Sequence, residues 1–92
     1  MGRRNNLDIC HDILKVTQGG ARKTRIVYQA NLNFKIVKKY LQRLIEGDLI
    51  EYREDVKRYF TTEKGSYWMT SYSYIVSPMK LIIDELGAIP QG

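Results

Sequence analysis

The sequence predicts a small, mostly helical α+β fold: three helices, a two-stranded hairpin and a C-terminal helical segment. Three features of the 92-residue chain predict this order. Apolar residues recur every three or four positions in three stretches of the first half, which is the spacing of amphipathic helices. Two short runs rich in aromatic and β-branched residues follow, as in a hairpin. A heptad-spaced apolar stripe then occupies the last third of the chain.

The first two helices fall within the first 30 residues. The first helix begins near Leu7, where Asn5 or Asn6 is placed to cap it, and the pair Gly19-Gly20 ends it. The second helix runs from Arg22 to Ala30 and turns its apolar residues inward. A short polar turn follows, because asparagines favour turns.

The third helix is predicted from its cap, its apolar face and its end. Asn33 is placed to cap a helix that runs to about Glu46, and Gly47 stops it. Ile45 is expected beside the apolar face. The residues expected on that face are Phe34, Val37, Leu41 and Leu44.

The hairpin and the C-terminal segment complete the chain. Strand-forming runs at residues 49–52 and 57–61 flank the polar pair Glu54-Asp55, and Thr61 or Thr62 then caps a further helix. Pro78 is expected to kink or split that helix, because proline has no backbone donor for it. We therefore expect a domain at residues 1–61, a helical segment at 62–87 and a fraying tail at 88–92.

The charge of the chain is unevenly distributed. Residues 13–45 hold eight cations and no acidic residue. Residues 1–45 sum to +8 and residues 46–92 to −3, which gives the formal net charge of +5. A one-signed block of this size favours a polyanionic partner on one side of the protein.

The order of the elements and the position of the cations together predict a winged helix-turn-helix fold. Three helices followed by a hairpin form the usual order of that fold, in which the third helix enters the DNA major groove. The outer face of the third helix is expected to collect cations and an amide. Lys35 with Lys39 and Lys39 with Arg43 are like-charge pairs four residues apart, and a phosphate backbone would relieve their repulsion.

We expect duplex DNA to bind the third helix, the start of the second helix and the base of the wing. The acidic pair at the wing tip opposes deep insertion into the minor groove. Bare solvated surface remains the alternative reading for any one of these cations. The candidate DNA-binding residues are Arg22, Lys23, Arg25, Asn33, Lys35, Lys38, Lys39, Gln42, Arg43, Lys57 and Arg58.

Residues 23–34, together with the sequence Thr62-Glu63-Lys64-Gly65, resemble the small basic archaeal winged helix-turn-helix proteins of the 10a type. The resemblance covers roughly residues 7–65. It implies binding of double-stranded DNA and a homodimer formed by a C-terminal helix in an antiparallel coiled coil. Thr61 stands where that family usually has an apolar residue, which predicts weaker packing of the last strand. The predicted dimerisation residues are Trp68, Tyr72, Ile75, Met79, Ile82 and Leu86.

Other functions find little support in the sequence. His11 next to Asp12 has no nucleophile beside it, so we expect no catalysis. One cysteine and one histidine do not make a structural metal site, and we expect neither a metal nor another cofactor. No apolar run reaches a membrane span and the first residues lack the apolar segment of a secretory signal, so we expect a cytoplasmic protein, nucleoid-associated through its DNA binding. Two roles stay open besides a transcriptional regulator: a chromatin-type protein and a protein-interaction module in a larger complex.

Overall fold

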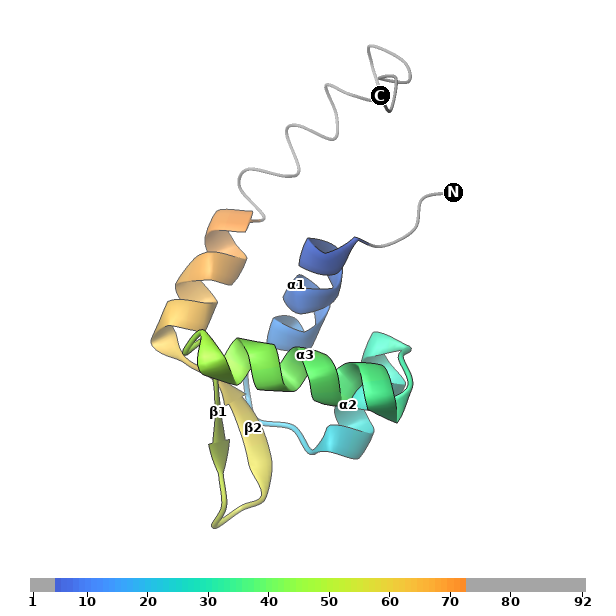
Figure 1. Cartoon of the computed structure of the whole chain (residues 1–92). Coiled ribbons are helices and arrows are strands. Elements are labelled where there is room, and N and C mark those ends of the chain that lie inside the picture. Colours follow the sequence, from blue (N-terminus) through green and yellow to red (C-terminus); the bar gives the residue numbers. More distant parts are fainter. Residues whose placement is uncertain (1–4, 73–92) are drawn as a thin grey trace, which may run out of the picture.

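The computed structural model describes residues 5–72 of the chain. Helix α3 lies across the molecule, with the hairpin projecting from one end of it and α2 packed near the other (Figure 1). The last described residues, 63–72, are helical. The predicted mostly helical α+β fold is confirmed. The named elements are α1 (Asn6–Val16), α2 (Lys23–Ala30), α3 (Phe34–Glu46), β1 (Ile50–Arg53) and β2 (Arg58–Thr61).

Side-chain caps start three of the four helices within residues 5–72. The Asn5 side chain accepts a hydrogen bond from the Asp8 N–H at 2.8 Å, and the Asp8 carboxylate accepts one from the Asn5 N–H. Asn33 caps α3 by accepting from the Ile36 N–H at 2.8 Å. Thr62 caps the helix at 63–72 by accepting from Gly65 at 3.0 Å. Each cap supplies an acceptor for an N–H that the first helical turn leaves unpaired.

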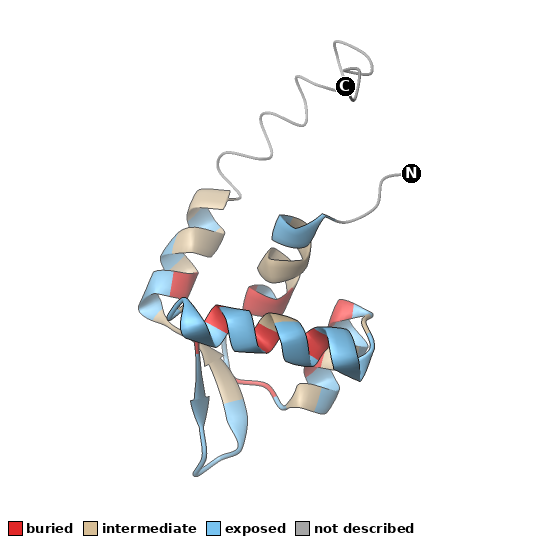
Figure 2. Cartoon of the chain, viewed as in Figure 1, coloured by how far each residue is buried: buried red, intermediate tan, exposed pale blue. Residues whose placement is uncertain are grey.

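The core lies where the three helices meet the first residue of the hairpin. In Figure 2 the buried residues of α3 recur along the helix, separated by exposed residues, as expected of an amphipathic helix. Because α1 and α2 each bury only two apolar side chains, the fold depends on their joint packing against α3. The buried apolar residues are Ile13, Leu14, Ala21, Ile26, Ala30, Val37, Leu41, Leu44 and Ile50.

Phe34 was predicted to lie in the core, and this prediction is wrong. The sequence placed it on the buried face of α3, but its side chain is 53% exposed. Phe34 is the first residue of the helix and lies at the edge of the apolar stripe. Leu32, in the preceding turn, is the residue that packs against the core there.

The end of α3 also differs from the expectation in detail. The helix does end at Glu46, but Gly47 has an ordinary φ of −84°. Asp48 takes the left-handed conformation with φ of 64°, directly before the Leu49-Ile50 pair. A position that glycine occupies without strain is therefore held by an aspartate, a residue type that tolerates this conformation better than most.

The hairpin is held to the helices by a third backbone segment. Strands β1 and β2 pair antiparallel with Tyr52 opposite Tyr59. Ala21, between α1 and α2, forms a bridge with Tyr59 through two backbone hydrogen bonds of 3.0 and 2.8 Å. This bridge fixes the base of the hairpin against the start of α2.

Thr61 does not weaken the last strand in the way that the sequence predicted. Its hydroxyl donates to the Leu14 carbonyl at 2.7 Å and lies 2.7 Å from the hydroxyl of Thr17. Thr17 is fully buried, and its hydroxyl also reaches the Ile13 carbonyl at 2.9 Å. The two hydroxyls carry one proton each, which they distribute among the carbonyls at the end of α1 and each other, so hydrogen bonds tie β2 to α1.

The helix at residues 63–72 packs against α1 of the same chain. Trp68 is partly buried against the core, and its ring stacks on Tyr72 at 5.2 Å. The Tyr72 ring lies 5.1 Å from His11, and its hydroxyl donates to Asp8. Burial, followed by this hydrogen bond, raises the pKa of Tyr72 to about 12. Both residues of the predicted dimerisation stripe that the structure describes thus have partners within their own chain.

The rest of the stripe lies outside the described residues. It comprises Ile75, Met79, Ile82 and Leu86, and the predicted break at Pro78 lies there too.

Candidate nucleic-acid interface

The outer face of α3 carries the largest group of predicted DNA-binding residues. Asn33 caps the helix, so its side-chain oxygen is already engaged with the backbone. Arg53 pairs with Glu51 and Lys57 lies near Glu54, and neither of these ion pairs involves α3. The exposed polar residues of this face are Lys35, Lys38, Lys39, Gln42 and Arg43.

The outer face of α3 is positively charged, because its cations form no ion pair with an acidic residue among residues 5–72. Four cations on one helix face raise the free energy of the unbound protein through their mutual repulsion. A surface ion pair of ordinary geometry would offset little of this repulsion. A phosphate lattice would offset more, because each contact also releases a counterion.

The remaining predicted cations fall on two sides of the hairpin. Arg22, Arg25 and Arg58 line one hollow of about 280 Å³ beside the Gly19-Gly20 turn, which we call the arginine groove. The first turn of α2 borders it and has neither a side-chain cap nor an acidic residue. Free backbone N–H groups at a helix start favour anions, so this groove is suited to a phosphate.

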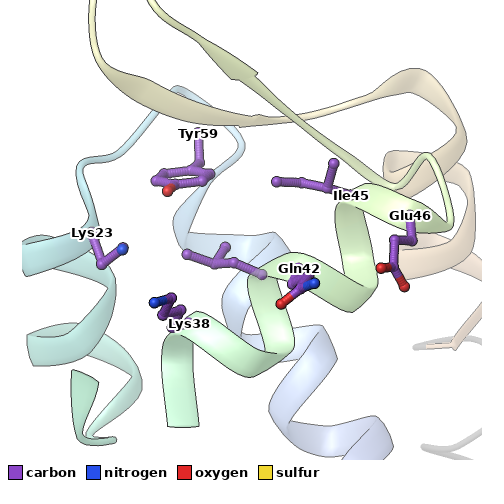
Figure 3. A pocket seen from close by; sticks show the side chains of 7 residues that line it. Lys23, Lys38, Gln42, Ile45, Glu46 and Tyr59 are labelled. Carbon is purple, nitrogen blue, oxygen red and sulfur yellow. The ribbon is translucent and has the colours of Figure 1, made fainter. Parts of the chain in front are cut away.

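The two other wing and α2 candidates lie elsewhere. Lys57 is at the turn of the hairpin, 3.9 Å from the Glu54 carboxylate, with a φ of 54°. Lys23 points to the opposite side of α2 from the arginine groove. It lines a second hollow of about 270 Å³ between α2, α3 and β2 (Figure 3).

We call this second hollow the wing groove. Lys38, Gln42 and Glu46 border it from α3, and Tyr59 borders it from the hairpin. Leu41 and Ile45 provide apolar surface. Sequence reasoning missed Tyr59, because nothing in the local pattern of β2 says which side chain faces α3.

A third hollow separates α1 from the opposite edge of α3. It is lined by Lys39, Arg43, Cys10, Asn6 and Tyr40. The Tyr40 hydroxyl donates to the Asn6 side chain at 2.7 Å and so joins the two helices. Burial raises the pKa of the Cys10 thiol, which favours its protonated form at neutral pH.

Residues 5–72 contain no group of three or more histidine, cysteine, aspartate or glutamate side chains that could hold a metal ion. Among the same residues, no helix has the length and apolar character needed to cross a bilayer.

Comparison with known families agrees with this architecture. The family described as "Winged helix-turn-helix" matches residues 3–80, which is most of the chain. The chain belongs to the winged helix-turn-helix family. In this family's terms, α2 and α3 are the helix-turn-helix and β1 and β2 form the wing.

A solved winged-helix structure shows the same fold over nearly the whole chain. It is the crystal structure of Sso10a-2, described as a DNA-binding protein from Sulfolobus solfataricus. The two sequences are 25% identical, the match covers 95% of this chain and 100% of the other, and the TM-score is 0.75. The resemblance to winged-helix proteins of the 10a type is thereby confirmed. A search of curated protein sequences gave no significant match.

Proposed function

We propose that this winged-helix protein binds double-stranded DNA with α3 in the major groove. The observation that carries the proposal is the outer face of α3, where four exposed cations and an amide have no acidic partner among the described residues. The fold match to Sso10a-2, a protein described as DNA-binding, supports the same function.

Each part of the surface has its own role in this proposal. Lysines and the arginine of α3 contact phosphates and base edges, while Gln42 is suited to a base edge because its amide both donates and accepts. The arginine groove contacts the backbone on the far side of the wing. The acidic wing tip keeps the hairpin out of the minor groove.

The salt dependence of binding tests the proposal. If about six phosphates are neutralised per subunit, log K should fall with log salt with a slope near −5, at about −0.9 per contact. Fluorescence anisotropy with a labelled random duplex measures it. An affinity that stays almost constant from low to moderate salt would refute the proposal. No shift of duplex DNA at micromolar protein and near-physiological salt would favour a protein-interaction module instead.

Two substitutions separate sequence reading from general coating. Lys39→Ala should weaken all duplexes alike, because a lysine mainly supplies nonspecific attraction. Gln42→Ala should relax the preference at one position if the protein reads a sequence. Selection of binding sites from a random pool gives both results. A wild-type pool with no enriched position would point to a chromatin-type role.

We also propose that the protein forms a homodimer through its C-terminal segment. Because Trp68 packs against the core and Tyr72 against α1 of their own chain, we assign the contacts between subunits to the later residues of the stripe. Sedimentation should show a dimer for the wild type and a monomer for Ile75→Asp or Ile82→Asp. If both variants keep the mass of the wild type, the stripe is not the interface.

A further inference from the structure

The wing groove brings together polar groups from three separate elements. Lys23 comes from the first position of α2, Lys38 and Gln42 from α3, and Tyr59 from β2. The bridge between Ala21 and Tyr59 fixes the distance between two of these elements, because Lys23 lies only two residues beyond Ala21. The groove is therefore a built feature of the fold and not a chance approach of long side chains.

Tyr59 is the residue that distinguishes this groove. Its ring packs against Tyr52, with centroids 4.7 Å apart, and against the core. Its hydroxyl makes no hydrogen bond to another residue in the described part of the chain, and Figure 3 shows it over α3 with the two lysines nearby. Burial, followed by the neighbouring Tyr52, raises the pKa of Tyr59, so the hydroxyl stays a donor at neutral pH.

We propose that the wing groove seats one phosphate of the DNA backbone, held by the Tyr59 hydroxyl together with the Lys23 and Lys38 ammonium groups. This inference rests on the proposed DNA binding and adds to it a defined phosphate position and a residue that the sequence did not single out. Tyr59 donates a hydrogen bond to a phosphate oxygen, and the two cations neutralise its charge.

The shape and charge of the groove fit a sugar-phosphate unit. Leu41, Ile45 and the Tyr59 ring offer apolar surface, which suits the carbon face of a deoxyribose. The cations lie at the end of the groove near α2, while the Glu46 carboxylate closes the other end and repels an anion there (Figure 3). A phosphate is therefore directed to the space between α2, α3 and the wing.

Tyr59→Phe is the direct test, because it removes one oxygen and keeps the ring. The affinity for a random duplex should fall roughly tenfold, which corresponds to the lower end for a hydrogen bond to a charged group. The salt slope should not change, since no cation is lost. Tyr28→Phe is the matched control: Tyr28 is 84% exposed on α2 and lines none of the three hollows. Unchanged thermal unfolding confirms that Tyr59→Phe is folded.

A double-mutant cycle tests whether the groups share one phosphate. Lys38→Met should reduce the salt slope by about 0.9. Combined with Tyr59→Phe, it should cost less than the sum of the single losses, because both act on one phosphate. Lys39→Met, on the opposite edge of α3, should combine additively with Tyr59→Phe.

The outcomes separate this inference from the function on which it rests. Binding by Tyr59→Phe within twofold of the wild type, with Lys39→Met still weakened, would overturn the phosphate seat and leave DNA binding intact. Strict additivity of Tyr59→Phe with Lys38→Met would overturn it as well. A wild type that does not bind duplex DNA at all would instead refute the proposed function.

Discussion

Gly65→Ala should destabilise the protein although it places a better helix former in a helix. Gly65 is buried at the start of the helix formed by residues 63–72. A Cβ at this position would collide with the Leu49 carbonyl oxygen and would lie 2.8 Å from the Thr61 methyl group. The Leu49 oxygen belongs to the backbone, so no rotamer change relieves the collision.

The size of the effect follows from what has to move. Alanine gains about 1 kcal/mol over glycine in a helix interior. Overpacking costs about 1–3 kcal/mol. Separating the helix from the turn before β1 also strains two hydrogen bonds of Thr62, to Leu49 at 3.0 Å and to Asp48 at 2.7 Å, each worth about 1 kcal/mol. If both hydrogen bonds are lost, we expect a net loss of about 2–4 kcal/mol.

Urea and thermal unfolding measure this loss, which corresponds to a fall in Tm of roughly 10–30 °C for a domain of this size. Gly47→Ala is the matched control. Its Cβ would meet only Arg43 and Leu44 carbonyl oxygens at 3.6 and 3.9 Å, and its φ is negative, so its stability should stay within about 0.5 kcal/mol of the wild type. Equal stability of the two variants would refute the close packing inferred at Gly65.

Three further substitutions test other features by urea unfolding. Asn33→Ala should cost about 1 kcal/mol through loss of the α3 cap, and an unchanged midpoint would contradict that role. Asp48→Gly should stabilise by up to about 1 kcal/mol, because glycine relieves the left-handed backbone, whereas a loss would show that the aspartate side chain is needed. Tyr72→Phe removes the bond to Asp8. The raised pKa of about 12 stabilises the folded state fully below pH 10, and this contribution is lost as pH rises toward 12. The stability gap between wild type and Tyr72→Phe should therefore narrow from pH 8 to pH 11; a constant gap would refute the assignment.

Local chemistry made the helix starts predictable from the sequence. Asn33 sits one residue before an amphipathic stretch, and its side chain reaches the backbone of its own neighbours, so nothing distant in the chain decides the cap. The predicted burial of Phe34 was wrong because burial, unlike a helix cap, depends on parts of the chain that are distant in sequence. Helical periodicity gives the direction of a side chain but not where the neighbouring helices end, and that limit decides whether Phe34 is covered.

The parts that sequence reasoning missed depend on contacts between distant segments. The sequence predicted that Thr61 weakens the packing of the last strand. In the fold, the Thr61 hydroxyl lies within hydrogen-bonding distance of Thr17 and of the end of α1. Tyr59 lies in the wing groove because its backbone pairs with that of Ala21. A heptad stripe likewise shows that a helix needs a partner surface. It does not show that Trp68 packs against the core, and Tyr72 against α1, of the same chain.

Several acidic residues form contacts near their own position in the fold and away from α3. Asp8 caps α1 and accepts from Tyr72, Glu51 pairs with Arg53 at 2.8 Å, and Glu54 lies near Lys57. None of these acids is placed to neutralise α3. Helix α3 itself has four cations and one acid, Glu46, so positive charge is denser there than the net charge of +5 implies. An anion approaching this protein is drawn toward α3 and toward the grooves on either side of the wing base, and the acidic wing tip repels it.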